Sequence, residues 1–125
     1  MNSNRVITVT LVLAGIYYAA VGILLWAVPG FFYAHVGRIG AYNAHYERDL
    51  GSFVLPLGIA LIAAAPAPAK HRLLLAAAGV ASLLHAFSHL AEGVRSAADA
   101  LTLLFFFIVA AALGACWWFS REVLE

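Results

Sequence analysis

The chain has 125 residues, of which 65% are hydrophobic and 10% charged, and its formal net charge is +1. Soluble domains carry about 25% charged and about 45–50% apolar residues, so a water-soluble fold would expose more apolar surface than such proteins tolerate. The small net charge and the lack of a basic run argue against nucleic-acid binding. The composition therefore favours an integral membrane protein that contacts the lipid bilayer.

Four runs without a charged residue divide the chain: 6–28, 50–69, 73–91 and 100–120. Each has about the 20 residues that an α-helix needs to cross roughly 30 Å of hydrocarbon. A helix is required because an unpaired backbone polar group is costly in lipid, and a helix pairs these groups within itself. We predict an all-α fold, a four-transmembrane-helix bundle forming a single integral membrane domain over residues 1–125. The predicted helices cover about 6–28, 46–66, 71–91 and 97–120, and a long polar and aromatic first loop covers 29–45.

Small residues recur on the predicted helices, including Gly15 and Ala19 on the first, Gly79 on the third and Gly114 on the fourth. Small side chains let membrane helices approach closely. We therefore expect close packing at these positions, and also at Gly51 near the start of the second helix. Cys116 is the only cysteine, so no internal disulfide or CxxC pair can form.

An even number of spans places both termini on one side of a multi-pass protein. That side holds four basic residues against three on the other. Two of those three, Arg48 and Arg95, lie among acidic residues that can form ion pairs with them. The positive-inside rule then favours cytoplasmic termini.

The same topology collects polar residues at one end of the bundle, toward the outer face of the membrane. Four of the five histidines and four of the six acidic residues belong to this end. Its ionisable residues include His35, His45, Glu47, Arg48, Asp49, His85, His89, Glu92, Arg95 and Asp99. We expect the functional centre at this polar end.

Two pairs of ligand-type residues have the spacing of one helix face. His85 and His89 are four residues apart in the third helix, and His45 and Asp49 are four apart at the start of the second. Imidazole with carboxylate suits zinc, iron or copper, and such side chains build metal sites inside soluble four-helix bundles. We predict His45, Asp49, His85 and His89 as metal ligands, and favour a transition metal over haem or quinone.

Four further residues are predicted to bind a cofactor at this end: Asn43, Arg48, Glu92 and Asp99. Asn43 can also cap the second helix, and Arg48 beside Asp49 can orient a histidine. Glu92 continues the face of His89, although a solvated loop charge is an alternative reading of it.

The histidines also admit simpler roles. His85 lies inside an apolar run, where a polar group needs a partner. A hydrogen bond to a neighbouring helix, a metal ion or proton transfer would each meet that need, and no HExxH motif is present to decide among them. His35 is expected at the membrane interface and His71 in a solvated loop.

Residues 42–51 contain the pattern Asn-x-His-x-x-Arg-Asp-x-Gly, which an apolar helix follows and then a helix with two histidines. In this pattern and in its topology the chain resembles small four-helix membrane proteins of the DoxX-like group. Some members of that group are linked to quinone-coupled sulfur oxidation, and many have no known activity. The resemblance implies one functional centre, formed by Asn43, His45, Arg48, Asp49, His85 and His89.

The favoured function is a membrane protein whose polar centre binds a metal ion or cofactor, with a redox-linked role. The first alternative is a metal-independent acid/base enzyme that acts on a lipid-like or quinone-like substrate, with His45, Asp49 and His85 as candidate catalytic residues. The second alternative is a non-catalytic subunit of a membrane complex, or a homo-oligomer. The sequence does not decide whether the chain is an enzyme.

Overall fold

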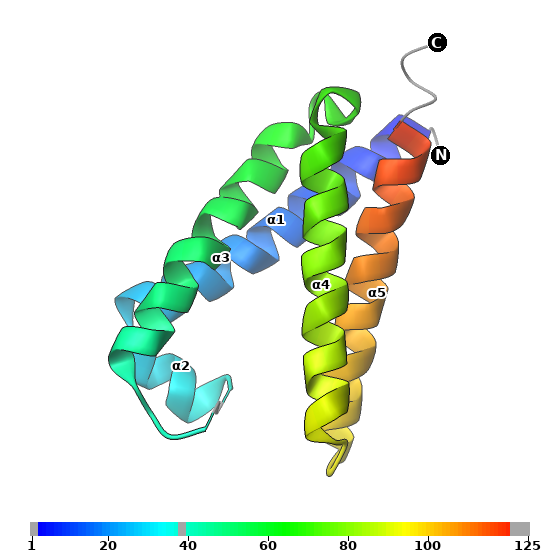
Figure 1. The fold of residues 1–125 in the computed structure, drawn as a ribbon. Helices are drawn as coiled ribbons and strands as arrows, with labels where there is room; N and C mark the ends of the chain where they lie inside the picture. Colours follow the sequence, from blue (N-terminus) through cyan, green and yellow to red (C-terminus); the bar gives the residue numbers. More distant parts are fainter. Residues whose placement is uncertain (1–2, 38–39, 121–125) are drawn as a thin grey trace. The chain divides into compact units, whose positions relative to one another are not determined.

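The computed structural model describes residues 3–37 and 40–120, and every regular element within them is helical (Figure 1). The elements are α1 (Ser3–Ala27), α2 (Pro29–His35), α3 (Ala44–Ala64), the 3-10 turn η1 (Pro68–His71), α4 (Arg72–Glu92) and α5 (Ala97–Phe119). The predicted all-helical fold is confirmed, and each of the four long helices begins and ends within three residues of its predicted bounds.

The predicted first loop, 29–45, contains the short helix α2, which the sequence reading missed. Pro29 occupies its first turn, where the fixed φ of proline suits a helix and its missing N–H costs nothing. Phe32 is buried, while its neighbour Phe31 is exposed. The segment is therefore a short amphipathic helix rather than an irregular loop.

The chain divides into two compact units, which we describe separately. Unit 1 comprises Met1–Leu11 and Ala64–Glu125, and unit 2 comprises Val12–Ala63. The first turns of α1 belong to unit 1 and the rest of α1 belongs to unit 2. Unit 1 therefore contains α4 and α5, and unit 2 contains α2 and nearly all of α3.

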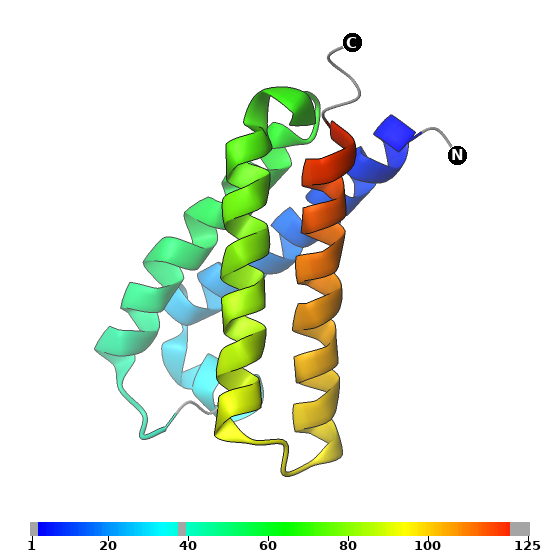
Figure 2. The same ribbon diagram turned by 45° about the vertical axis from the view of Figure 1, so that its right-hand side comes forward.

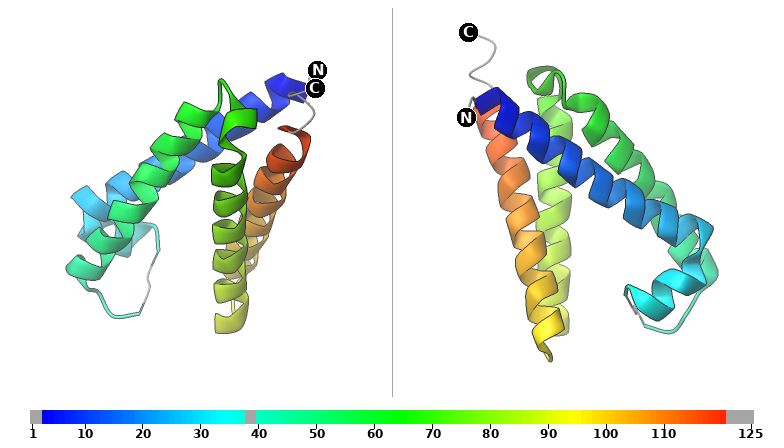
Figure 3. Two further views of the ribbon diagram at one scale, coloured as in Figure 1. Left: turned by 45° about the horizontal axis from the view of Figure 1, so that its top comes forward. Right: turned by 180° about the vertical axis from the view of Figure 1, so that it is seen from behind.

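Within unit 2, α1 and α3 pack backbone to backbone (Figure 3). A Cβ atom added to Gly15 would lie 2.8 Å from the carbonyl oxygen of Gly58, and one added to Gly51 would lie 2.8 Å from the backbone nitrogen of Trp26. A Cβ atom added to Gly22 or Gly58 would likewise collide with backbone atoms of the facing helix. The expected close approach at Gly15 and Gly51 is confirmed.

Within unit 1, α4 and α5 run side by side in opposite directions (Figure 2). Leu75 and Leu113 are completely buried. The two helices leave more room than α1 and α3, because a Cβ atom on Gly79 would meet ordinary contacts of 3.6 Å or more and one on Gly114 would meet open space. Gly79 lies close to the backbone of α5, with the added Cβ atom 3.6 Å from the nitrogen of Gly114, but the approach is less tight than that of α1 and α3.

In the part of the chain that the structure describes, three helical stretches are long and apolar enough to cross a membrane: Asn4–Ala27, Pro68–Glu92 and Ala97–Phe119. Many of their large apolar side chains are exposed, including Leu13, Leu73 and Leu101, as a lipid-facing surface requires. The helix α3 differs because its first turns carry Glu47, Arg48 and Asp49, and because it ends at Ala64. Its apolar part, residues 50–64, is shorter than the roughly 20 residues of a full span.

Candidate functional site

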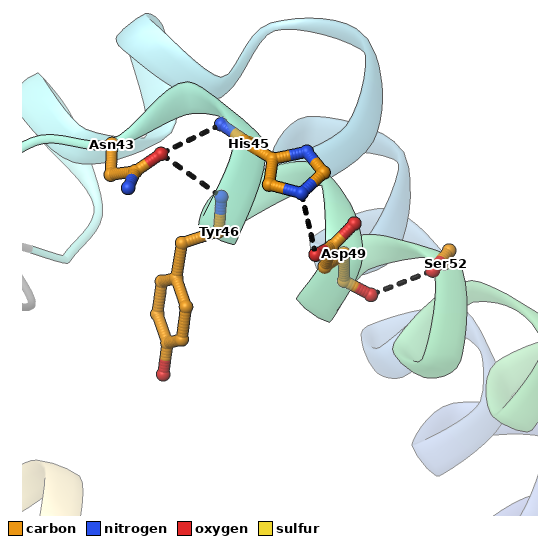
Figure 4. A network of polar contacts seen from close by, with 5 residues as sticks. All are labelled: Asn43, His45, Tyr46, Asp49 and Ser52. Atoms are coloured by element: carbon orange, nitrogen blue, oxygen red, sulfur yellow. Dashed lines mark hydrogen bonds and ion pairs between the residues drawn. The ribbon is translucent and has the colours of Figure 1, made fainter.

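Asn43 sets the start of α3 by capping it. Its side-chain oxygen Oδ1 accepts hydrogen bonds from the backbone N–H groups of His45 and Tyr46, at 3.0 and 3.2 Å (Figure 4). The first N–H groups of a helix have no partner within the helix, and an asparagine at this position supplies one. The predicted cap is confirmed, and it fixes the direction in which the next residues project.

One turn of α3 brings His45 and Asp49 together on an exposed face (Figure 4). The Nε2 atom of His45 lies 3.3 Å from Oδ2 of Asp49, and their side chains are 87% and 59% exposed. The backbone carbonyl of Asp49 accepts a hydrogen bond of 2.7 Å from the hydroxyl of Ser52. Asp49 therefore contacts His45 directly. Arg48, the next residue in the motif, is exposed on the same helix.

Glu47 lies between these residues in sequence but on the opposite face of α3. It is only 1% exposed, and its Oε2 atom has no hydrogen-bond partner among the described residues. In the sequence, Glu47 is one more charge of the polar end. The sequence signal for its burial is its spacing of four residues from Gly51. Residues four apart share a helix face, and Gly51 faces α1.

His85 and His89 form a second pair, on α4 in unit 1. Their Nε2 atoms lie 3.1 Å apart, and both rings lie against the ring of Phe106 on α5. The centroid of the Phe106 ring lies 4.0 Å from that of the His85 ring and 5.6 Å from that of the His89 ring. The ring of His89 is nearly parallel to that of Phe106. The aromatic contact limits the orientations that both imidazoles can adopt.

A cavity of about 350 Å³ lies at the end of α4, lined by His89, Glu92, Gly93, Arg95 and Asp99. Several polar groups in its wall form hydrogen bonds with neighbouring residues of the same turn. The backbone N–H of Arg95 donates to Oδ2 of Asp99 at 2.9 Å, and its Nη2 donates to the carbonyl oxygen of Glu92 at 3.2 Å. Ser96 caps α5 by accepting from the N–H of Asp99 at 3.1 Å. Asp99 thus helps to hold the turn between α4 and α5.

The predicted ligands are present as two pairs, one in each unit. His45 and Asp49 belong to unit 2, and His85 and His89 belong to unit 1. Among residues 3–37 and 40–120, no group of three or more histidine, cysteine, aspartate or glutamate side chains is arranged to hold a metal ion. A single centre made from both pairs stays a prediction.

The chain was compared with protein-family models, with curated proteins and with solved structures, and none of them matches.

Proposed function

We propose that this chain is an integral membrane protein that binds a transition metal ion through His85 and His89. The observation that carries the proposal is the distance of 3.1 Å between the two Nε2 atoms. Two histidine nitrogens bound at about 2.0–2.1 Å to a tetrahedral zinc ion lie about 3.3 Å apart. The observed distance is therefore close to the separation that two ligands of one ion require.

The state of the two protons decides between a hydrogen bond and a metal site. If one ring carries its proton on Nε2, it donates to the other and the pair is satisfied by itself. If both carry it on Nδ1, both Nε2 atoms keep a lone pair that a metal ion can accept. The contacts with Phe106 support this arrangement because they hold both rings before an ion arrives. Imidazole ligands suit zinc, iron or copper.

Two histidines leave coordination positions open for water, a substrate or further side chains. Glu92 and Asp99 line the adjacent cavity, and His45 with Asp49 would complete the centre that the resemblance to the DoxX-like group implies. In this proposal α3 is the fourth crossing of a four-helix bundle. Its charged first turns would lie at the membrane surface, and the uncharged residues 65–69 follow its end.

Metal titration of the purified protein in detergent, after treatment with a chelator, tests the proposal. We expect one zinc or cobalt ion per chain, and a loss of affinity of at least about tenfold in both His85→Ala and His89→Ala. Removing a residue that only hydrogen-bonds to a metal ligand already costs about tenfold, so removing the ligand itself should cost at least as much. His71→Ala is the matched control and should bind as the wild type does. Equal affinity in all three variants would refute the site.

A His45→Ala variant in the same titration tests the single centre. If His45 completes the site, its loss lowers the affinity as the loss of His85 does. Unchanged affinity would restrict the ligands to the α4 pair. Binding should also weaken in acidic buffer, because protonated imidazole has no lone pair for a metal.

The second candidate is a metal-independent acid/base function on a lipid-like or quinone-like substrate. The cavity beside His89 favours it, because Glu92 and Arg95 lie in its wall and the histidine pair can share a proton. A protein that stays metal-free in the titration but loses binding of a quinone analogue in His89→Ala would favour this function.

A further inference from the structure

Another cavity lies in unit 1, at the start of α4 and therefore at the opposite end of that helix from the histidine pair. It has a volume of about 300 Å³ and lies between the first turns of α1, which contribute Asn4 and Thr8, and the segment 66–70 that joins α3 to α4. The hydroxyl of Thr8 donates a hydrogen bond of 3.2 Å to the carbonyl oxygen of Ala65. This bond ties the two walls of the cavity together.

The wall of this cavity combines an apolar surface with two polar donors. Residues 66–69 are prolines and alanines, whereas Asn4 and Lys70 supply an amide and an ammonium group. Both of these side chains are exposed and can donate hydrogen bonds. Among residues 3–37 and 40–120 the one ion pair joins His45 to Asp49, so the ammonium group of Lys70 has no carboxylate partner there.

The charge around the cavity has one sign. Arg5, Lys70 and Arg72 lie in the first turns of α1 and at the start of α4. The acidic residues of unit 1 that the structure describes, Glu92 and Asp99, lie at or beyond the far end of α4, a helix of 21 residues and hence about 30 Å long. The C-terminal acidic residues lie outside the described residues. The described part of this end therefore favours an anionic ligand.

Lys70 rather than Arg72 is the cation that is available to such a ligand. The Nε atom of Arg72 donates to the carbonyl oxygen of Trp117 on α5 at 3.3 Å, and its guanidinium carbon lies 5.3 Å from the centre of the Trp117 ring. These contacts hold the Arg72 side chain against α5. Lys70 lines the cavity itself.

We propose that this cavity binds the phosphate headgroup of an anionic phospholipid. The ammonium group of Lys70 and the amide of Asn4 bind the phosphate oxygens, and the proline and alanine wall contacts the glycerol part. Leu73, three residues after Lys70, is 85% exposed and offers an apolar surface to an acyl chain. The volume lies at the lower end of the range of about 300–1,000 Å³ for ligand pockets, which suits a headgroup rather than a whole lipid.

The combination of apolar wall and cation favours a lipid over a soluble anion, and basic pockets between membrane helices are known to bind anionic headgroups. The cavity is separate from the histidine pair on α4. The lipid site therefore stands whether or not that pair binds a metal ion.

Native mass spectrometry of the full chain in detergent, with added phosphatidylglycerol or phosphatidylcholine, tests the proposal. We expect one phosphatidylglycerol molecule per chain, bound more tightly than phosphatidylcholine. Lys70→Gln should lower the affinity for phosphatidylglycerol about fivefold, the factor expected for one basic residue near an anionic lipid surface. Arg95→Gln, which removes the same charge at the far end of α4, is the matched control. Wild-type affinity in Lys70→Gln, or an equal loss in Arg95→Gln, would overturn the proposal.

Two further measurements separate the cavity from general surface charge and the lipid from a free anion. Ala67→Leu fills the cavity without a change of charge and should also weaken phosphatidylglycerol binding, whereas unchanged binding would place the headgroup elsewhere. Inorganic phosphate should not displace the lipid, and displacement by it would show a simple anion site instead. Lys70 is exposed, so Lys70→Gln should fold as the wild type does and decides the proposal whatever the stability of Ala67→Leu.

Discussion

Asn43 and Asp49 both carry the resemblance to the DoxX-like group, and both have local roles in α3. Asn43 accepts hydrogen bonds from two backbone N–H groups at the start of the helix, and Asp49 contacts His45 one turn away. A contact between two side chains as exposed as these contributes roughly 0–1 kcal/mol. Part of the motif is therefore explained by helix initiation, which needs no ligand.

The cap makes a prediction for Asn43. Replacement by alanine removes both side-chain hydrogen bonds and should lower the free energy of unfolding by about 1 kcal/mol, the usual cost of losing such a cap. Asn43→Ser should keep most of the stability, because serine caps helices about as well. Unfolding in detergent at increasing denaturant measures both. If Asn43→Ala also abolished metal binding while its stability stayed at the wild-type level, the residue would be a ligand-binding residue rather than a cap.

At the scale of the helix, the two helix pairs use glycine differently. Gly15 and Gly22 on α1 and Gly51 and Gly58 on α3 are each spaced by seven residues, and all four adjoin atoms of the facing helix. Between α4 and α5, Gly114 faces open space. Close backbone contact is a main source of packing between membrane helices, so the α1–α3 pair should be the more sensitive to added methyl groups.

This contrast predicts the effect of single methyl groups. Gly58→Ala would place a Cβ atom against the backbone of Ala19 and should cost about 1–3 kcal/mol, the range for overpacked sites. Gly114→Ala should be neutral or stabilising by up to about 1 kcal/mol, because alanine favours the helix. Melting temperatures of the two variants in detergent provide the comparison. Equal losses in both would contradict the close approach of α1 and α3.

For the whole molecule, the number of crossings depends on α3. The other three long helices have the length and hydropathy of a span, whereas the first turns of α3 are charged and its apolar part is short. If α3 crosses, the loops on either side of it lie on opposite faces of the membrane. If it lies on the surface, both loops lie on the same face.

Single cysteines introduced in a Cys116→Ser background can measure this topology with a membrane-impermeant maleimide on intact cells. If the termini are cytoplasmic, as the positive-inside rule favours, Ala41→Cys and Val94→Cys should label from outside and Ala69→Cys only after permeabilisation, because four crossings then put the first and third loops on the outer side. Labelling of the 41 and 69 positions from the same side would contradict a fourth crossing. Labelling of only the 69 position from outside would keep the four crossings and reverse the orientation.

The long helices could be predicted from the sequence, because runs without charge have few stable alternatives in lipid. Their predicted bounds agree with the observed helices within three residues. It also predicted the cap at Asn43 and the close approach at Gly51, since capping and small-residue packing depend on local residue type. It missed α2, where Pro29 and Phe32 gave only a short signal.

Only the tertiary structure decided that Glu47 is buried while His45 and Asp49 are exposed, and that the rings of His85 and His89 meet beside Phe106. Spacing places residues on the same face of a helix, but it does not say which face turns toward another helix. That rotation is set by contacts between distant segments, such as the packing of Gly51 of α3 against Trp26 of α1.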